Sequence, residues 1–327
     1  MDKAQKRRFR PEGLLLGALA LLAAVLCIVY FRQIAQAVGL FADYLSRGFI
    51  RRALVAGLSV SLCAALLGVC LVLKRYSMIG DGLSHVGFGA LAVAMSLGYV
   101  AQSSPFYGLC RGISAHPVAF TTVVVMVLAI LLLRINGSSR IKGDAAIALL
   151  STGALALGVI VISTTEGMNI DISNYMFGSI LSVGKGDVWF ALGMCAVVTA
   201  AFVLSYPRLF AVTFDETFAR SGGVPAGAYN LLLAVLTAVT VVMGMRLMGT
   251  MLISSLIIFP AMIARRLVAS FRGMVLTAAG VSVGCFLIGL YLSYQLSLPT
   301  GACIVAVNLA ALVVSMIVSR LDGLKNR

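Results

Sequence analysis

Apolar stretches separated by short polar segments make up most of the sequence. A helix needs about 20 mostly apolar residues to cross the hydrocarbon core of a bilayer, and ten stretches are of that order. The pattern therefore predicts an all-α fold, a polytopic transmembrane bundle of about ten spans. These cover approximately residues 14–31, 52–73, 80–100, 117–134, 145–163, 187–206, 228–246, 249–267, 274–294 and 299–319.

One further apolar segment, residues 172–183 (ISNYMFGSILSV), is too short to span the membrane. It lies between the fifth and sixth predicted helices, on the outer side. Irregular backbone at membrane depth is tolerated only where protein or a water-filled cavity covers it. A re-entrant or interfacial helix fits this segment, and so does an ordinary amphipathic loop.

The composition supports a protein of the cell membrane, surrounded by lipid. Hydrophobic residues make up 61% of the chain and charged residues 11%, and the mean hydropathy is +1.06. Soluble domains have about 45–50% apolar residues and about 25% charged residues. The net charge of +14 would suggest nucleic acid in a soluble protein. Here the basic residues cluster between apolar stretches, so topology explains them and no nucleic-acid partner is expected.

The distribution of Lys and Arg predicts the orientation, because cytoplasmic loops are enriched in both. With the N-terminus inside, 18 of the 25 Lys and Arg residues lie on the inner side, which predicts that both termini are cytoplasmic. A basic segment, Lys3–Arg10, precedes the first helix, but no small-residue cleavage site follows Tyr30-Phe31-Arg32. We therefore expect a retained anchor rather than a signal peptide. The predicted organisation is residues 1–36 as a basic N-terminus with this extra helix, and residues 37–327 as the main domain.

The segment Ser77–Gly89 (SMIGDGLSHVGFG) carries the residues best suited to chemistry. Asp81 and His85 are four residues apart and share one face of a helix. A carboxylate and an imidazole can together ligate zinc, manganese or iron, and a charged residue within an apolar span is usually functional. Alternatively, Asp81 could cap the helix at the membrane surface, with Ser84 and His85 solvated. The spacing alone does not separate the two interpretations.

Glycine and proline mark places where backbones could pack closely or helices could bend. Glycines at positions 80, 82, 87 and 89 surround the Asp81–His85 pair, where they allow the helix to unwind or another backbone to approach. Pro260 interrupts the span in LISSLIIFPAMIARR. The backbone groups that it frees need partners, so this site should pack against neighbouring helices or line a cavity.

The predicted cytoplasmic loop Tyr206–Ala228 contains the sequence TFDETFARSGGVP. Thr213 can cap a short helix there, and Asp215 and Glu216 favour its first turn. Gly222-Gly223 then ends it. A short helix on the cytoplasmic face is a docking element in many transporters.

These motifs, in this order, resemble the metal-ion permease family of ABC importers. The resemblance runs from about Phe41 to Arg320 and opens with FIRRALVAGLSVSLCAALLGVCLVLKRYSMIGDGLSH. It continues through KGDAAIALLSTGALALGVIVIS, NYMFGSILSV and FDETFARSGGVP, and it closes with MGTMLISSLIIFPAMIARRL and LSYQLSLPTGACIVAV. The helix before Phe41 is a departure, since many members lack it.

The resemblance implies roles for particular residues. It assigns Asp81 and His85 to contact with the metal in transit, with Ser84 and Pro260 as pathway or gating candidates. It assigns a coupling helix near residues 214–224 to contact with an ATPase subunit. The residues expected to make or shape that contact are Asp215, Glu216, Ala219, Gly222 and Gly223.

The resemblance also implies partners. The expected partners are cytoplasmic ABC ATPase subunits, an extracytoplasmic metal-binding protein and a second permease subunit, which we expect to be a further copy of this chain. The metal would be transported cargo, zinc or manganese, and no permanently bound cofactor is expected. Because an imidazole must be neutral to ligate, transport should weaken at acidic pH.

The expected function is the permease subunit of an ATP-driven importer of a divalent transition metal, with zinc favoured over manganese or iron. The sequence has no GxxxxGK[ST], HExxH or GxSxG motif, so we expect no enzyme activity in this chain and ATP hydrolysis in the partner. Two alternatives remain. One is an ABC permease for an iron chelate or cobalamin, and the other is a gradient-driven secondary metal transporter, which would need intramembrane carboxylates that the predicted spans lack apart from Asp81.

Overall fold

The structure is a computed structural model that describes residues 48–76, 78–99, 106–135, 143–165, 178 and 183–325. Apart from the first residues of α2, the described part belongs to one unit, Arg52–Arg327. The predicted anchor helix, and with it the whole N-terminal region 1–36, lies outside the described residues. So does the short apolar segment 172–183, except for Gly178 and Val183.

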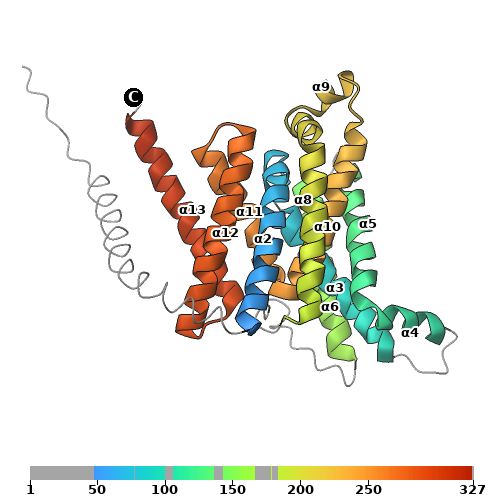
Figure 1. The fold of residues 1–327 in the computed structure, drawn as a ribbon. Coiled ribbons are helices and arrows are strands. Elements are labelled where there is room, and N and C mark those ends of the chain that lie inside the picture. The colour runs from blue at the N-terminus through green and yellow to red at the C-terminus, as the bar shows by residue number, and fades with distance from the viewer. Residues whose placement is uncertain are drawn as a thin grey trace, which may run out of the picture. The chain divides into compact units, whose positions relative to one another are not determined.

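The described part of the chain is helical throughout and contains no strand. Figure 1 shows long helices running side by side, connected by short segments. The helices are α2 (Gly48–Leu73), α3 (Ile79–Ser96), η1 (Leu97–Tyr99), α4 (Tyr107–Ala115), α5 (Pro117–Ile135), α6 (Gly143–Thr164), α8 (Lys185–Phe214), α9 (Glu216–Ser221), α10 (Ala226–Met248), α11 (Thr250–Leu267), α12 (Phe271–Leu296) and α13 (Thr300–Lys325).

Eight helices in the described part are long and apolar enough to cross a membrane. A bend of 91° separates α4 from residues Pro117–Leu132 of α5, and counting this pair as one span gives nine. The multi-pass membrane architecture predicted from hydropathy is thus confirmed. The total of ten spans and the cytoplasmic location of the termini remain predictions.

Contacts at the helix ends agree with the predicted alternation of sides. Lys74, which follows α2, donates a hydrogen bond to Asn230 near the start of α10, and both belong to the predicted inner side. At the opposite end of α10, Arg246 lies 3.3 Å from Asp187 in the first turn of α8, and both belong to the predicted outer side. These two contacts agree with the sides predicted for the ends of α2, α8 and α10.

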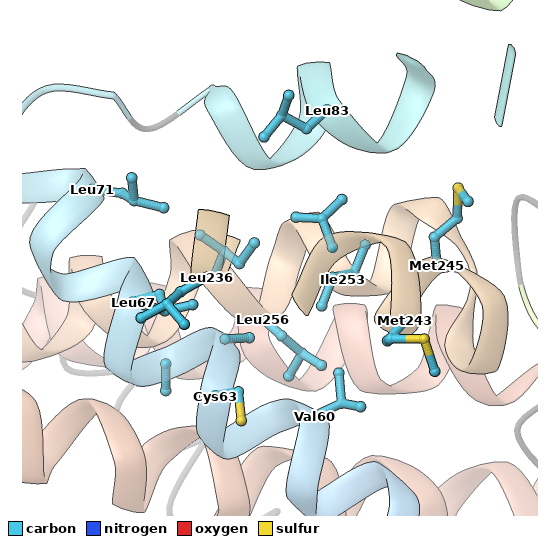
Figure 2. Close-up of a cluster of buried hydrophobic side chains, with 14 of the residues drawn as sticks. Val60, Cys63, Leu67, Leu71, Leu83, Leu236, Met243, Met245, Ile253 and Leu256 are labelled. Atoms are coloured by element: carbon cyan, nitrogen blue, oxygen red, sulfur yellow. The ribbon is translucent and has the colours of Figure 1, made fainter. Parts of the chain in front are cut away.

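The apolar core is built around α2 and α10. In the most apolar window of α2 83% of the residues are buried, against 22% in α6, α8 and α13. The outer helices therefore present apolar side chains such as Trp189 and Leu204 to the surroundings, which is the pattern expected of a bundle in lipid. Figure 2 shows side chains of α2, α3, α10 and α11 meeting in this core. The labelled residues are Val60, Cys63, Leu67, Leu71, Leu83, Leu236, Met243, Met245, Ile253 and Leu256.

Glycines set the closest approaches between helices. A Cβ added at Gly68 of α2 would lie 2.1 Å from the carbonyl oxygen of Ile257 in α11, and one at Gly89 of α3 would lie 2.4 Å from that of Ala154 in α6. Small residues allow such backbone contact, which drives helix association where lipid removes the hydrophobic effect. The predicted close approach at Gly89 is confirmed, whereas the helix does not unwind there.

The predicted boundary between the seventh and eighth spans is confirmed. α10 and α11 meet at Gly249, whose φ of 92° suits glycine rather than other residues. Gly178, with φ 71°, lies against this turn, because a Cβ there would be 2.0 Å from the carbonyl oxygen of Met248. One point of the segment 172–183 thus contacts the α10–α11 turn.

The end predicted for the sixth span was wrong. It was placed at Tyr206, but α8 continues through Pro207 to Phe214. The extension is held by aromatic contacts: the ring centroids of Phe210 and Phe214 lie 5.3 Å and 6.0 Å from that of Phe271 at the start of α12. A tertiary contact therefore overrides the helix-breaking tendency of proline.

Substituting Gly68 should destabilise the bundle. Gly68→Ala places a Cβ against the immobile backbone of α11, which we expect to cost about 1–3 kcal/mol through overpacking. Thermal unfolding of the detergent-solubilised protein measures this loss. Gly193→Ala in α8 is the matched control, because nothing lies within 4 Å of its added Cβ. An equally small effect of both substitutions would contradict the packing argument.

Candidate functional site

Asp81 and His85 lie at the beginning of α3, where the helix starts with Ile79 and its N-cap residue is Met78. Asp81 is therefore in the first turn and is not the N-cap, so the alternative of a capping aspartate is wrong. A carboxylate in the first turn is favoured by the helix dipole. α3 packs against α5, α6, α10 and α11.

The two side chains meet on one face of α3, as predicted. His85 Nε2 lies 3.5 Å from Asp81 Oδ1, with the Asp81 side chain 41% exposed and that of His85 18% exposed. His85 Nδ1 is buried, and no hydrogen-bond partner for it exists among the described residues. Buried polar atoms normally bond to protein groups or to water. The pair is therefore accessible from one side, and its imidazole has one nitrogen without a partner among the described protein groups.

The pair offers two ligands, and the described residues supply no third. No group of three or more His, Cys, Asp and Glu side chains occurs in the part of the chain that the structure describes. Zinc takes four ligands and manganese suits an oxygen-rich site. The remaining positions on an ion must be filled by water, by backbone carbonyls or by groups from another subunit.

Ser84 is fully buried, which corrects the expectation that it could be solvated. Its hydroxyl donates to the Asp81 carbonyl oxygen over 2.8 Å and lies 3.4 Å from Ser254 Oγ in α11. Neighbouring Gly80 would place a Cβ 2.9 Å from Ile257 Cδ1 of the same helix. The beginning of α3 is thus fixed against α11 by both polar and close apolar contact.

Pro260 is buried within α11, and the helix continues on both sides of it. It lies three residues after Ile257, whose carbonyl contacts Gly68. The structure thus places Pro260 in a packed helix, as expected.

A cavity of about 200 Å³ lies elsewhere, between α3, α5 and α10. Its lining is mostly apolar and lies toward the other end of α3, around Leu91 and Met95. It does not include Asp81 or His85, so it is not part of the candidate metal site.

The short helix predicted in the loop Tyr206–Ala228 exists as α9, but its N-cap residue differs from the prediction. Asp215 is the N-cap, and its Oδ1 accepts a hydrogen bond of 2.9 Å from the Phe218 backbone N–H. Thr213, predicted to be the cap, still belongs to α8. Because α8 extends to Phe214, the chain turns two residues later than expected.

The end of α9 agrees with the sequence. Gly223 has φ 78°, and Val224 N–H donates to the Ala219 carbonyl oxygen over 3.0 Å. Gly223 N–H donates to the Arg220 carbonyl oxygen over 3.0 Å. These bonds form the motif in which a left-handed glycine closes a helix. Gly222 is the C-cap residue, so both predicted glycines end the helix.

The side chains of α9 divide into an anchored and an open face. Ala219 is 2% exposed and packs against Val212 and Ala226 in a small cluster of its own. Phe218 is 74% exposed. Ala219 therefore attaches α9 to the neighbouring helices α8 and α10, whereas the side chain of Phe218 is exposed. Phe218 was not predicted from the sequence. Its apolar ring in a polar loop is the signal that could have identified it.

Glu216 connects α9 to other helices. Its Oε1 accepts from Arg220 Nη2 over 2.5 Å and its Oε2 from Asn230 Nδ2 over 3.0 Å. Burial raises the pKa of Glu216, but the bonds from Asn230 and Arg220 and the charge of Lys74 outweigh it, so the pKa is lowered overall. The carboxylate therefore stays ionised. Lys74 and Asn230 were not predicted as functional, because their meeting depends on contacts distant in sequence.

The geometry defines a class: a polytopic membrane protein with a carboxylate–imidazole pair at one helix start and a short helix between two spans. The chain belongs to the ABC 3 transport family, whose model matches residues 46–319. This membership confirms the resemblance found in the sequence.

Relatives named as metal transport proteins align with most of the chain. The manganese transport system membrane protein MntC of Halalkalibacterium halodurans is 29% identical over 287 residues, which are 88% of this chain and 93% of the relative. The "Probable iron transport system membrane protein" of Haemophilus influenzae is 29% identical over 273 residues, 84% and 94% of the two chains. Among solved structures, PsaBC from Streptococcus pneumoniae in complex with Fab matches with a TM-score of 0.71 at 28% identity, covering 85% of this chain and 95% of that chain.

Removing the cap should loosen α9 without disturbing the bundle. Asp215→Ala deletes the acceptor for the Phe218 N–H, which typically costs about 1 kcal/mol. We expect faster amide hydrogen exchange within residues 216–221 of the solubilised protein. Thr217→Ala, an exposed position in the same helix, is the control and should leave the exchange unchanged. Unchanged exchange in Asp215→Ala would show that the cap does not hold the helix.

Proposed function

We propose that this chain is the membrane-spanning permease subunit of an ATP-driven importer of a divalent transition metal. The observation that carries the proposal is the Asp81–His85 pair, two metal-ligating side chains that meet within an apolar span of an ABC 3 family bundle. The chain itself would not hydrolyse ATP. An extracytoplasmic binding protein would deliver the ion, and ATPase subunits would drive the cycle.

Manganese is the cargo that we favour, with iron second. The relatives' names mention manganese and iron, and the preference for zinc expected from the sequence receives no support from them. One carboxylate and one imidazole, without thiolate, suit manganese at least as well as zinc. The metal is cargo, so its contact with the pair must be weak enough for release.

A second permease subunit would complete the site. Asp81 and His85 supply only two ligands, and Asp81 is accessible from outside its own chain. A further copy of this chain that placed the same pair opposite would give four. The path for the ion would then run between the two subunits.

The ATPase subunits would contact the open face of α9. Phe218 offers an exposed apolar ring, and the ionised Glu216 and Arg220 flank it. The caps at Asp215 and Gly223 fix the position of that surface. This assigns Asp215, Gly222 and Gly223 to the shape of the docking helix, and Ala219 to its attachment.

Substitution of the pair tests the site. Asp81→Ala and His85→Ala each remove one of two ligands, so we expect uptake of radioactive Mn²⁺ to fall by about tenfold or more. Co-purification with the ATPase subunit should be retained, because α9 is untouched. His116→Ala is the control, since it removes the protein's other histidine, which lies between α4 and α5. Uptake at the normal level in both Asp81→Ala and His85→Ala would contradict the assignment of the two residues to metal contact.

Competition between metals tests the cargo. Mn²⁺ uptake should be reduced by unlabelled Mn²⁺ more than by equal concentrations of Zn²⁺ or Fe²⁺. Stronger competition by Zn²⁺ would instead support the preference first expected from the sequence. Uptake of an iron chelate or cobalamin in place of the free ion would identify the alternative permease class. Uptake that continues without ATP but needs an ion gradient would identify a secondary transporter.

A further inference from the structure

Three parts of the chain meet at the side chain of Asn230, near the start of α10. Its Nδ2 donates to Glu216 Oε2 in α9 over 3.0 Å. Its Oδ1 accepts from Lys74 Nζ, at the end of α2. One amide therefore links the short helix α9 to α2 through a continuous chain of hydrogen bonds.

Lys74 is joined firmly to the helix that carries the Asp81–His85 pair. Arg75 has φ 63°, Tyr76 N–H donates to the Leu71 carbonyl oxygen over 2.8 Å, and Arg75 N–H donates to that of Val72 over 3.1 Å. This left-handed closure fixes how α2 ends. Ile79 N–H then donates to the Tyr76 carbonyl oxygen over 3.1 Å at the start of α3. A displacement of Lys74 would therefore be transmitted to the beginning of α3.

Stability alone does not account for the hydrogen bonds that join Lys74, Asn230 and Glu216. Burial lowers the pKa of Lys74, although the charge of Glu216 opposes that shift. Apolar side chains of similar volume often hold helices together at least as well as buried charged groups. Hydrogen bonds additionally fix the relative position of the groups that they join, because they form only within a narrow range of distance and angle.

We propose that Lys74 and Asn230 are positioning residues that make α9 and the start of α3 move together, so that movement of the docking helix changes the surroundings of Asp81 and His85. This rests on the proposed function, in which α9 contacts the ATPase and the pair contacts the metal. Asn230 is the link on which the connection depends, since its side chain bonds to both neighbours.

Cutting the link should separate ATP hydrolysis from transport. Asn230→Leu removes both hydrogen bonds at similar volume, and Lys74→Met removes the far end. In the complete complex, reconstituted with its ATPase and binding protein, both variants should still bind the ATPase and hydrolyse ATP. The Mn²⁺ imported per ATP should fall by about fivefold or more. Tyr229→Phe is the control, because its hydroxyl accepts from Arg208 of α8 and leaves Asn230 intact.

A rescue experiment separates the link from a loss of folding. Asn230→Asp alone sets two carboxylates against each other and should lower the Mn²⁺ imported per ATP. Combining it with Glu216→Gln reverses the direction of the bond: the amide introduced in α9 would donate to the carboxylate introduced in α10, which still accepts from Lys74. The double variant should therefore recover transport per ATP. No recovery in a double variant that still binds the ATPase would overturn the proposal.

Hydrogen exchange provides a readout independent of the cargo. On binding of the ATPase with a non-hydrolysable ATP analogue, the amides of residues 79–85 should change their exchange in the wild type and not in Asn230→Leu. The same change in both, or normal Mn²⁺ per ATP in both Asn230→Leu and Lys74→Met, would overturn the link. Wild-type complex that binds the ATPase but imports no Mn²⁺ would contradict the proposed cargo alone, because the exchange result still tests the link.

Discussion

In a hydrocarbon environment helices associate mainly through close van der Waals contact, and the position of α3 depends on such contact. Its glycines let neighbouring helices approach to distances that a Cβ would forbid, as at Gly89 against Ala154 and at Gly80 against Ile257. The contact at Gly80 places the first turn of α3 against α11. The Asp81–His85 pair inherits its geometry from this placement, since both side chains stand on that first part of α3.

Features that depend on residues close together in the sequence could be predicted. Membrane-length helices follow from apolar stretches, and the turn at Gly249 follows from a residue that tolerates positive φ. The pairing of Asp81 with His85 follows from helix periodicity. The close of α9 at Gly223 was predictable for the same local reason.

What the sequence could not supply depends on contacts between distant residues. The extension of α8 past Pro207 is held by Phe271, which belongs to a much later helix. The cap of α9 moved from Thr213 to Asp215 as a consequence. Asn230 looks like an ordinary polar residue at a helix start until the fold brings Lys74 and Glu216 to it. Burial of Ser84 likewise follows from the approach of α11, which periodicity does not reveal.

The two ends of α10 carry the polar contacts of an otherwise apolar helix. At its start Asn230 binds α9 and the end of α2, and at its other end Arg246 lies beside Asp187 of α8. Between them, buried residues such as Val241 and Met245 pack tightly in the core, and packed cores switch between discrete arrangements rather than deforming smoothly. If the bundle alternates between two states, α10 would move as a rigid body, and the bonds of Asn230 would carry α9 and the end of α2 with it. If Asp81 and His85 contact the metal as proposed, two ligands from one chain would let the ion leave during such switching, whereas a complete four-ligand site within one chain would resist it.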